Sequence, residues 1–444
     1  MPLKLYHYNN MKSFILRNIF WLNDFFHGAP VRKQYNSIRA GIKDKTVRRR
    51  ALDELLSYAT TRCAFYKEYA GCNLSQFPVI DKMVIKNNQT SFVVPEADNP
   101  WQDSTKGYYI QKTSGSTGVP FAIPQDIRKR NRRLAELKYF GEVVGFVSHA
   151  PLVQLRIWTN WQNKSKWQSF KENIEPFDCS NLSEKRLYEL VELIRKKRTL
   201  CVRGYASSFE IIGNFLKRNN LKLPSVRVMI AGSEALLEST RALIKETCPN
   251  CHIISQYANE EAGIMGQEEP GIMGKFILNH AGYVFEVLKT DSDEPVAPGE
   301  VGRLVITDLY NYACPLIRYD TGDMCSYDID ERSGDMVITQ LFGRRLDLVF
   351  NTHGEPIFPM YFARVLKNYD AIVQWQFVQK DEKSYTLRLT LDSENRDFSE
   401  QWADIYSQLS QLLGADAELQ VEYVEDIPVL KSGKRKSCVN EWRK

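Results

Sequence analysis

Short apolar segments alternate with longer helical stretches over about residues 108–342, and this alternation restricts the fold more than any other feature of the chain. Val226–Ile230 and Arg303–Thr307 have the composition of strands, whereas Ser183–Lys197 and Leu237–Thr247 have apolar residues at helical spacing. Helices between strands indicate an α/β architecture, because each helix can cover one face of a sheet. We therefore predict an α/β fold for this part of the chain.

The pattern changes near Gly343, where shorter and more closely spaced elements begin. The sequence beyond it predicts a short helix after Pro359, strands over 372–378, 385–391 and 419–424, a helix over 398–413 and a Lys-rich end. About 100 residues of mixed α and β suffice for a small separate domain. We therefore expect a large N-terminal domain with several subdomains, residues 1–342, and a small α+β domain, residues 343–444.

The charge and the cysteines limit the class of protein. The chain has 444 residues, a net charge of +5 and nine cysteines. So small an excess of charge gives no strong reason to expect a nucleic acid partner. The cysteines are odd in number and irregularly spaced, unlike the disulfide framework of a small secreted domain. We expect reduced thiols and a cytoplasmic protein.

Aromatic and aliphatic residues recur at near-helical spacing in residues 14–26. Lys12, Arg17, Asn18 and Asp24 interrupt the apolar run, which argues against a signal peptide and against a membrane-spanning helix. Two interpretations stay open for this segment. One is a helix docked on the protein's own core, which is the commoner case in soluble chains, and the other is an amphipathic helix that lies on a membrane surface.

A cluster of small and hydroxylated residues follows a predicted strand in the first part of the chain. It consists of Thr113, Ser114, Gly115, Ser116, Thr117 and Gly118. Glycines let the backbone approach a ligand closely, and backbone N–H groups and hydroxyls donate hydrogen bonds to phosphate oxygens. No Gly-Lys-Ser/Thr follows, so the cluster is not a Walker loop. A solvated turn can have the same composition, and other segments must decide between the two.

Four further segments follow along the chain: Ala231–Glu234 after an apolar strand, Gln256–Glu261, Arg318–Asp323 and Lys431–Lys434. With the loop at 113–118, they resemble in type and order the motifs of the acyl-adenylate-forming superfamily. The resemblance is to its phenylacetate-CoA ligase-like branch, which includes relatives assigned to capsular polysaccharide biosynthesis. It covers nearly the whole chain, and five motifs in order are far more specific than any one of them.

The resemblance implies an enzyme that uses ATP and Mg²⁺ to activate a carboxylic acid as an acyl-adenylate. A thiol then accepts the acyl group. CoA is the first expectation for this thiol, while a carrier-protein thiol and an amino sugar stay open as acceptors. The resemblance also implies that residues 343–444 are mobile and that they carry the catalytic lysine into the cleft between the domains.

The resemblance assigns most nucleotide contacts to the N-terminal domain. The loop Thr113–Gly118 would hold the β- and γ-phosphates of ATP. Tyr257 would stack on the base, and Glu261 would coordinate Mg²⁺, a role that suits a hard carboxylate beside polyphosphate. Backbone contacts to adenine would come from Gly232, Ser233 and Glu234.

Residues near or beyond the domain boundary complete the implied site. Asp323 would accept hydrogen bonds from both ribose hydroxyls, and Arg344 would bridge ribose or phosphate oxygens with its fixed donors. Lys434 would place a cation where the carboxylate attacks the α-phosphate. Leu346 stands where an acidic hinge residue is frequent in the family. Core packing, a turn or a solvated tail could explain each such residue alone, and the order of the motifs favours the functional interpretation.

The sequence also departs from the family pattern beside the nucleotide motifs. Ala258 follows the tyrosine where glycine is usual, and Glu260 stands where Thr or Ser is usual. Either Glu260 or Glu261 is therefore a candidate magnesium ligand. Phe121 stands where a basic residue is frequent, which weakens the expected grip on pyrophosphate or shifts it to Lys112. These departures keep a second hypothesis open, a non-catalytic nucleotide-binding or scaffolding protein that retains the fold.

Three other patterns support weaker interpretations. The basic run Arg128–Arg133 is typical of a solvated helix face, with attraction of CoA or a carrier protein as the alternative. Cys248–His252 matches a haem-attachment pattern, which we reject because apolar residues continue from it into a strand. A zinc site that adds His280 or Cys314 lacks a second close ligand pair. Four residues lie either near the acid or in the core: Arg156, Trp158, Trp161 and Tyr205.

Overall fold

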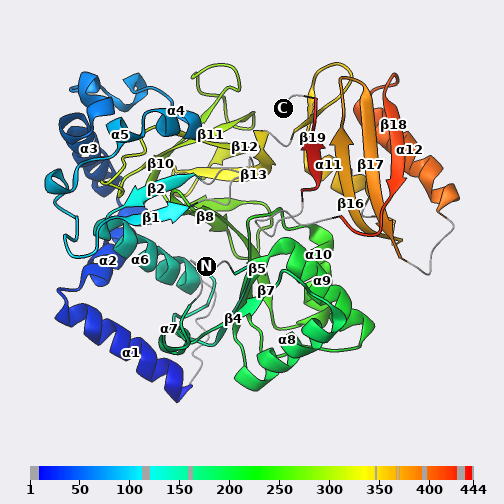
Figure 1. Ribbon diagram of the computed structural model, residues 1–444, viewed down its shortest axis with the longest axis horizontal. Coiled ribbons are helices and arrows are strands. Elements are labelled where there is room, and N and C mark those ends of the chain that lie inside the picture. Colours follow the sequence, from blue (N-terminus) through cyan, green and yellow to red (C-terminus); the bar gives the residue numbers. More distant parts are fainter. Residues whose placement is uncertain are drawn as a thin grey trace. The chain divides into compact units, whose positions relative to one another are not determined.

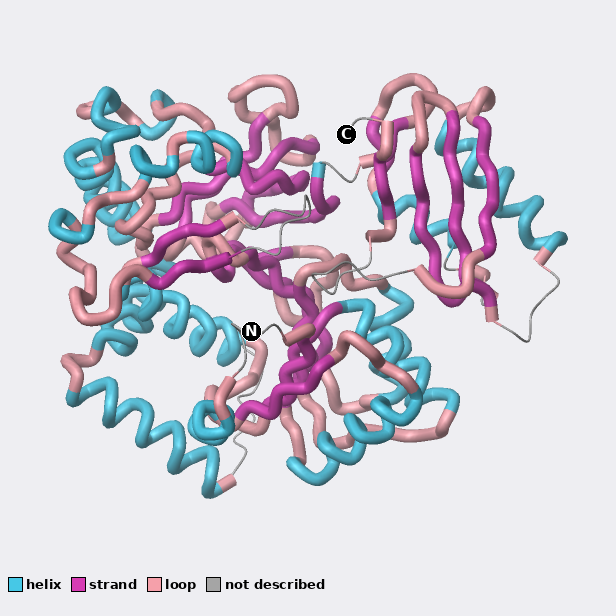
Figure 2. Tube along the Cα trace, in the orientation of Figure 1, coloured by secondary structure: helices cyan, strands magenta, loops and turns pink. Residues whose placement is uncertain are grey.

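The computed structural model describes residues 10–112, 121–158, 164–345, 348–366, 368–369, 371–392, 398–427 and 436–442. It divides the chain into two compact units (Figure 1 and Figure 2). One unit comprises residues 1–321 and 326–340, and the other comprises residues 322–325 and 341–444. The predicted boundary at 342/343 and the predicted mobility of the C-terminal part stay predictions.

The main sheet has, among the described residues, eleven strands in the order β10-β11-β12-β13-β9-β8-β7-β6-β5-β3-β4. The strands are β3 (Leu152–Arg156), β4 (Ile174–Asp178), β5 (Cys201–Tyr205), β6 (Val228–Gly232), β7 (His252–Asn259), β8 (Gly263–Glu268), β9 (Phe276–Leu278), β10 (Tyr283–Leu288), β11 (Val301–Asp308), β12 (Tyr319–Ile329) and β13 (Met336–Arg344). The neighbouring strands β4, β3, β5, β6 and β7 are parallel, and β7, β8 and β9 pair antiparallel. The predicted α/β architecture is therefore confirmed.

The central strand β6 is buried at four of its five residues, which explains its continuous apolar sequence. The helices that follow β4, β5 and β6 along the chain are α8 (Glu184–Lys197), α9 (Ala206–Arg218) and α10 (Glu238–Thr247). They pack beside the parallel strands (Figure 1), and their apolar side chains form one core with Leu155 and Val202. A second core joins Cys201 and Val228 to Phe146. The helices predicted over 183–197 and 237–247 are confirmed.

The remaining elements of the N-terminal unit surround this sheet. They are α1 (Met11–Phe26), α2 (Pro30–Lys43), α3 (Lys45–Arg62), α4 (Lys82–Asn87), α5 (Gln89–Phe92), β1 (Tyr109–Lys112), β2 (Ala122–Gln125), α6 (Ile127–Val143) and α7 (Lys166–Glu172). The helix expected near the N-terminus is α1. In the described part of the chain, none of the helices combines the length and the apolar character that crossing a bilayer requires.

The basic run Arg128–Arg133 begins α6, and the expectation of a solvated helix face is wrong for two of its residues. Lys129 and Arg132 are fully buried. Lys129 Nζ lies 2.6 Å from Asp308 Oδ2, and Arg132 Nε lies 3.3 Å from Glu136 Oε1. Because Asp308 ends β11, the first pair fastens α6 to the sheet. Arg132 also donates to the backbone carbonyl of Ala281 at 2.6 Å, so the run is a structural anchor at these two positions.

The C-terminal unit is built around a four-stranded sheet in the order β18-β17-β16-β19, as far as the described residues show. Its elements are β14 (Val349–Phe350), β15 (Pro356–Ile357), α11 (Pro359–Leu366), β16 (Ile372–Gln379), β17 (Ser384–Leu391), α12 (Ser399–Leu413), β18 (Glu418–Tyr423) and β19 (Cys438–Asn440). Helices α11 and α12 share one apolar core with the strands. The predicted α+β unit is confirmed, with additions. The short strands β14 and β15 pair antiparallel, and β19 pairs parallel with β16 where the sequence indicated only a Lys-rich end.

Candidate active site

Several predicted site residues lie where parallel strands end. β3 ends at Arg156, β5 at Tyr205 and β6 at Gly232. Tyr205 is in register with Gly232, and Gly232 with Gln256 of β7, so neighbouring strands end at about the same level. In open α/β sheets, ligands bind outside the carboxyl ends of the strands. This edge is therefore the candidate active site.

The segment Gly232–Glu234 leaves β6 with a left-handed residue, because Ser233 has φ 70°. Glu234 then turns towards α9, and its Oε2 accepts a hydrogen bond from the backbone N–H of Ser207 at 2.9 Å. A carboxylate at the first turn of a helix is stabilised by the unpaired N–H groups and by the helix dipole. The Glu234 side chain thus holds the start of α9. The adenine contacts were expected from the backbone of Gly232–Glu234, and they stay a prediction.

Tyr257 lies in β7 next to a β-bulge between Tyr257 and Ala258. Its side chain is 8% exposed. The chain then reverses into β8: Asn259 Oδ1 accepts a hydrogen bond from the N–H of Ala262 at 2.7 Å, and Gly263 has φ 112°, which favours glycine. This tight turn holds the two acidic residues between Asn259 and Ala262 beside the strand end.

Glu261 is buried in this turn and is held from three directions. Lys82 Nζ lies 2.8 Å from Glu261 Oε1, and the hydroxyl of Tyr319 donates to the same oxygen at 3.3 Å. Gln125 Nε2 donates to the backbone carbonyl of Glu261 at 2.9 Å. Gln125 belongs to β2, whose first residue follows Phe121 and the segment 113–120. The strand that leaves the predicted phosphate loop therefore positions the predicted metal ligand.

Lys82 is a residue that the sequence did not single out. Ile80 forms a parallel bridge with Tyr319, and Asp81 caps α4 by accepting hydrogen bonds from two backbone N–H groups. Lys82 is the first residue of α4, and its ammonium contacts Glu261. Its ammonium also lies 6.0 Å from the ring centre of Phe121. No sequence motif marks this lysine, and only the long-range bridge brings it to the site.

Glu260 faces a different pair of cations. Arg156 Nη2 lies 3.0 Å from Glu260 Oε1, and Arg133 Nη2 lies 3.8 Å from Glu260 Oε2. Arg133 also donates to the backbone carbonyl of Glu260 at 2.8 Å. With Lys82, the cations at this turn outnumber the two carboxylates, and such an excess favours a polyanionic ligand. The sequence left open whether Arg156 lies near the substrate or in the core. In the structure it is one of the cations at the candidate active site.

Tyr205 is the last residue of β5, and Trp158 lies two residues beyond the end of β3. Burial raises the pKa of Tyr205 to about 12, although nearby Arg156 opposes this shift, so the phenol stays protonated at neutral pH. The indole N–H of Trp158 donates to the carbonyl of Phe177 at 3.3 Å. Trp158 is thereby tied to β4, while Tyr205 presents a neutral hydroxyl at the strand end.

Other predicted residues lie outside the described residues or in the second unit. The loop residues Thr113–Gly118, Trp161, Leu346 and Lys434 lie outside the described residues. β1 and β2 form an antiparallel hairpin in which Lys112 pairs with Ala122, on either side of the loop. Asp323 in β12 and Arg344 at the end of β13 are half-buried residues of the second unit. The site roles of these residues stay predictions.

Among the described residues, the support for a metal site is limited to the single carboxylate of Glu261. Within the described ranges, no three His, Cys, Asp or Glu side chains are grouped so as to hold an ion. The zinc site considered for Cys248–His252 thus finds no support there, and all nine cysteines are free. Magnesium is commonly held by one or two carboxylates together with substrate phosphates. The buried carboxylate of Glu261 fits that pattern if the nucleotide supplies the other ligands.

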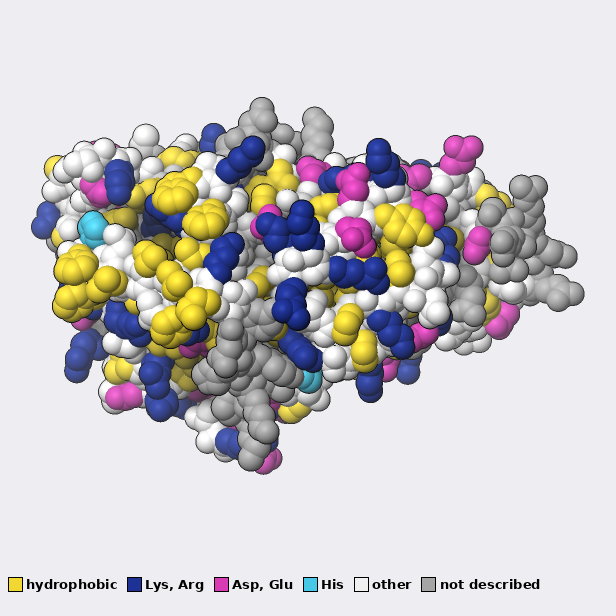
Figure 3. Space-filling model, turned by 90° about the horizontal axis from the view of Figure 1, so that it is seen from below, with side chains coloured by type: hydrophobic (Ala, Val, Ile, Leu, Met, Phe, Trp, Pro, Cys, Tyr) yellow, Lys and Arg dark blue, Asp and Glu magenta, His cyan; other side chains and the backbone are white. Residues whose placement is uncertain are grey.

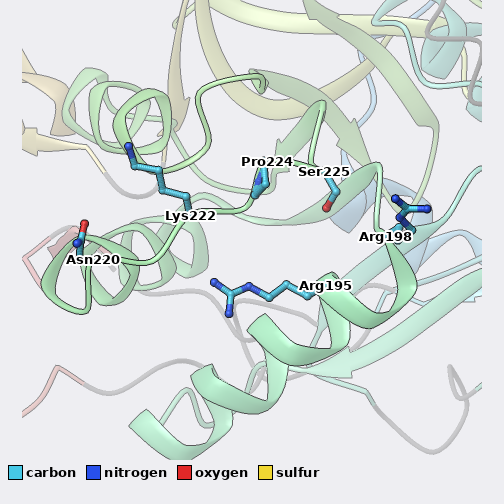
Figure 4. A pocket seen from close by; sticks show the side chains of 6 residues that line it. All are labelled: Arg195, Arg198, Asn220, Lys222, Pro224 and Ser225. Carbon is cyan, nitrogen blue, oxygen red and sulfur yellow. The ribbon is translucent and has the colours of Figure 1, made fainter.

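A wide hollow of about 770 Å³ lies elsewhere in the N-terminal unit (Figure 4). It adjoins the ends of the parallel strands opposite to the candidate site, because α8 precedes β5 and the segment 220–225 precedes β6. Three of the side chains that line it are cationic. It shares no residue with the candidate site, and its lining consists of Arg195, Arg198, Asn220, Lys222, Pro224 and Ser225.

Comparisons with known proteins agree with this architecture. Residues 349–441 match the CapK C-terminal domain. The chain is 22% identical to Protein CapK of Staphylococcus aureus over 386 residues, which are 84% of this chain and 82% of that protein. A structure of 2-hydroxyisobutyryl-CoA ligase in complex with 2-HIB-AMP has a TM-score of 0.70 at 16% identity and covers 90% of this chain and 89% of that chain. The anthranilate CoA ligase AuaEII in complex with anthranoyl-AMP has a TM-score of 0.57 at 16% identity, with 74% and 64% covered.

Proposed function

We propose that this chain, which has the fold of the acyl-adenylate-forming ligases and a CapK C-terminal domain, activates a carboxylic acid with ATP as an acyl-adenylate. The acyl group is then transferred to a thiol, for which CoA is the first candidate. The similarity to acid-CoA ligases supports this acceptor. The similarity to CapK supports a place in cell-surface polysaccharide biosynthesis, where an amino sugar or a carrier-protein thiol is the alternative acceptor.

One observation carries the proposal. Glu261 is buried at the carboxyl edge of the parallel strands and is fixed there by Gln125, which belongs to the strand that leaves the loop 113–120. This arrangement supports a site in which the loop and Glu261 act on the same polyphosphate. The surrounding cations Lys82 and Arg156 favour the binding of an anion at that edge.

The proposed chemistry has two steps. An oxygen of the substrate carboxylate forms a bond to the α-phosphorus of ATP while the bond to the pyrophosphate oxygen breaks. The carboxylate needs no general base, because it is ionised at neutral pH. A thiolate then forms a bond to the acyl carbon, and AMP leaves. Bound Mg²⁺ would neutralise phosphate charge, and we assign Glu261 to hold it.

The exchange of labelled pyrophosphate into ATP tests this proposal with a panel of carboxylic acids. We expect at least one acid to support exchange, and exchange to require a divalent cation. A chain that binds ATP but shows no exchange with any acid would favour the non-catalytic nucleotide-binding alternative and contradict the proposed function.

The metal ligand is tested by isosteric substitutions at the adjacent glutamates. We expect Glu261→Gln to raise the Mg²⁺ concentration for half-maximal exchange by about ten-fold or more, because an inner ligand is lost. Glu260→Gln should change it much less, since Glu260 is held by two arginines. A magnesium titration of the exchange rate checks both variants. A larger effect of Glu260→Gln would place the metal on the neighbouring residue.

Lys82 is tested against a lysine on the same helix. We expect Lys82→Met to lower kcat/KM for MgATP by about ten-fold, because the ion pair with a buried carboxylate and a cation near the phosphates are lost together. The matched control is Lys86→Met, which removes the same charge from an exposed position of α4. The exchange rate is measured against MgATP concentration. Equal behaviour of the Lys82 and Lys86 variants would exclude Lys82 from the site.

The ribose contact is tested at Asp323. We expect Asp323→Ala to weaken ATP binding by about 100-fold without unfolding the protein, since a carboxylate that accepts two hydrogen bonds is lost. Calorimetric titration with ATP measures the affinity. Asp328→Ala, at an exposed position of the same strand, is the matched control. An unchanged dissociation constant in Asp323→Ala would remove this residue from the nucleotide site.

A further inference from the structure

The outward side of α1 carries large apolar side chains that are exposed in the described structure. Their exposed fractions range from 46% for Ile15 to 73% for Phe26. The residues follow at intervals of one, three and four, so they form a single stripe along the helix. Scattered exposed apolar residues are ordinary, whereas a contiguous set marks an interaction surface. The α1 stripe consists of Phe14, Ile15, Ile19, Leu22, Phe25 and Phe26.

Contacts on the opposite side of α1 keep the stripe turned outward. The carboxylate of Asp24 is buried and accepts hydrogen bonds from the N–H groups of Val31 and Arg32, both at 2.9 Å. Lys138 Nζ lies 3.7 Å from the ring centre of Phe20. Rolling the helix to bury the stripe would break these contacts and would expose or orphan the Asp24 carboxylate. The expected docking of α1 on the protein's own core is confirmed for Leu16, Phe20 and Trp21, but the stripe takes no part in it.

Helix α7 extends the apolar surface beside the start of α1. Trp167 and Phe170 are 64% and 49% exposed, and their rings are stacked with centres 5.8 Å apart. Lys12 Nζ of α1 lies 4.8 Å from the ring centre of Phe170, so the two helices meet there. Tryptophan with neighbouring lysines is typical of surfaces that sit at the level of lipid headgroups.

The charged residues near the stripe are mostly cationic, and the one carboxylate of α7, that of Glu172, is paired with Lys164. Residues 10–43 contain six Lys and Arg residues and a single acidic residue, the buried Asp24. At the helical angle between successive residues, Lys12 and Arg17 fall along the two borders of the stripe. The face that contains α1 shows hydrophobic side chains gathered with Lys and Arg among them (Figure 3). This pattern is complementary to an apolar layer with an anionic surface.

We propose that the α1 stripe, with Trp167 and Phe170 of α7, docks this protein on the surface of an anionic phospholipid bilayer. The apolar side chains enter the headgroup region while Lys12 and Arg17 contact lipid phosphates. The helix lies in the plane of the surface, because its 16 residues extend over roughly 24 Å, less than the apolar thickness of a bilayer. No residue of the candidate active site belongs to α1 or α7.

A second copy of the chain fits this surface less well. In a symmetric pair the same patch meets itself, so the cationic borders of two stripes would come together. Like charges opposed across an interface are unfavourable. An anionic bilayer instead offers the complementary charge along the whole face.

Sedimentation of the full-length protein with lipid vesicles tests the proposal. We expect co-sedimentation with vesicles of equal parts phosphatidylcholine and phosphatidylglycerol, weaker binding at high salt, and little binding to pure phosphatidylcholine. Ile19→Glu, in the middle of the stripe, should lower the partition coefficient by roughly ten-fold or more, since an apolar side chain is lost from the lipid. Asn23→Glu makes the same charge change on α1 outside the stripe and should have a much smaller effect.

Both variants change exposed positions, so their thermal unfolding should match that of the wild type. Three results would overturn the proposal. One is the absence of binding to phosphatidylglycerol vesicles, and another is equal loss of binding in the two variants. The third is self-association of the wild type without lipid that Ile19→Glu abolishes, which would assign the stripe to a second copy of the chain.

Discussion

Lys434→Ala should lower acid-dependent ATP–pyrophosphate exchange by about 10²- to 10³-fold or more, the loss typical of removing a principal electrostatic stabiliser from an active site. Attack of a carboxylate on a phosphate brings two anions together, and the resemblance places Lys434 at that point. The structure describes both flanks of the segment 428–435. Gln374 Oε1 accepts a hydrogen bond from the Ile427 N–H at 2.9 Å, and Gln376 Nε2 donates to the Lys436 carbonyl at 2.9 Å.

The second half-reaction separates a catalytic role from a folding role. If the C-terminal unit delivers Lys434 only for adenylation, Lys434→Ala should convert a supplied acyl-adenylate to the thioester at nearly the wild-type rate. Lys436→Ala removes the same charge nearby and should change exchange far less. Each half-reaction is measured separately by product release. Equal loss of both in Lys434→Ala would indicate a defect in folding or closure and would exclude the alternation of domains.

Lys129→Met should lower the free energy of unfolding by about 3–5 kcal/mol, because it leaves a buried carboxylate without its cation. Lys129 Nζ lies 2.6 Å from Asp308 Oδ2, and both side chains are at most 1% exposed. The buried Glu136 lies close enough for the Asp308 charge to raise its pKa, an effect smaller than that of its own burial. Denaturant unfolding, followed by tryptophan fluorescence, measures the loss.

The matched control is Lys289→Met, which breaks an exposed ion pair with Glu294. We expect no change in its unfolding midpoint, since exposed pairs contribute little. Adding Asp308→Leu to Lys129→Met should recover most of the lost stability, because the unpaired carboxylate is then gone. A double variant that is less stable than Lys129→Met would contradict the role assigned to this pair.

Local sequence patterns predicted those helices and strands that are long enough to show a regular spacing of apolar residues. Alternation over 372–378 and 385–391 corresponds to β16 and β17, and the helical spacing of 398–413 corresponds to α12. By contrast, β19 has only three residues and owes its existence to pairing with β16. A strand so short carries too little periodicity to be recognised without its partner.

Charges were harder to interpret than apolar residues, because their environment depends on distant partners. Arg128–Arg133 has the composition of a solvated face, yet Lys129 meets Asp308 from β11. Lys82 has no motif at all, and it reaches Glu261 only because Ile80 pairs with Tyr319. Such pairings come from the tertiary fold, and no local pattern records them.

The N-terminal segment shows a third kind of limit. Its apolar spacing predicted α1, but the same spacing fits a buried stripe and an exposed one. The buried contacts of Asp24 with the start of α2 decide which side faces outward. Asp24 interrupts the apolar run in the sequence, and in the structure its contacts set the orientation of the helix.

The most direct test of acyl-adenylate formation follows oxygen from the acid to the nucleotide. The acid identified by the exchange assay is labelled with ¹⁸O in its carboxylate and incubated with ATP, Mg²⁺ and the thiol acceptor. Mass spectrometry should find one label in AMP, because a carboxylate oxygen stays on the α-phosphorus when the acyl group leaves. Label in inorganic phosphate with formation of ADP would show an acyl-phosphate instead, and unlabelled AMP would show that no acyl-adenylate forms.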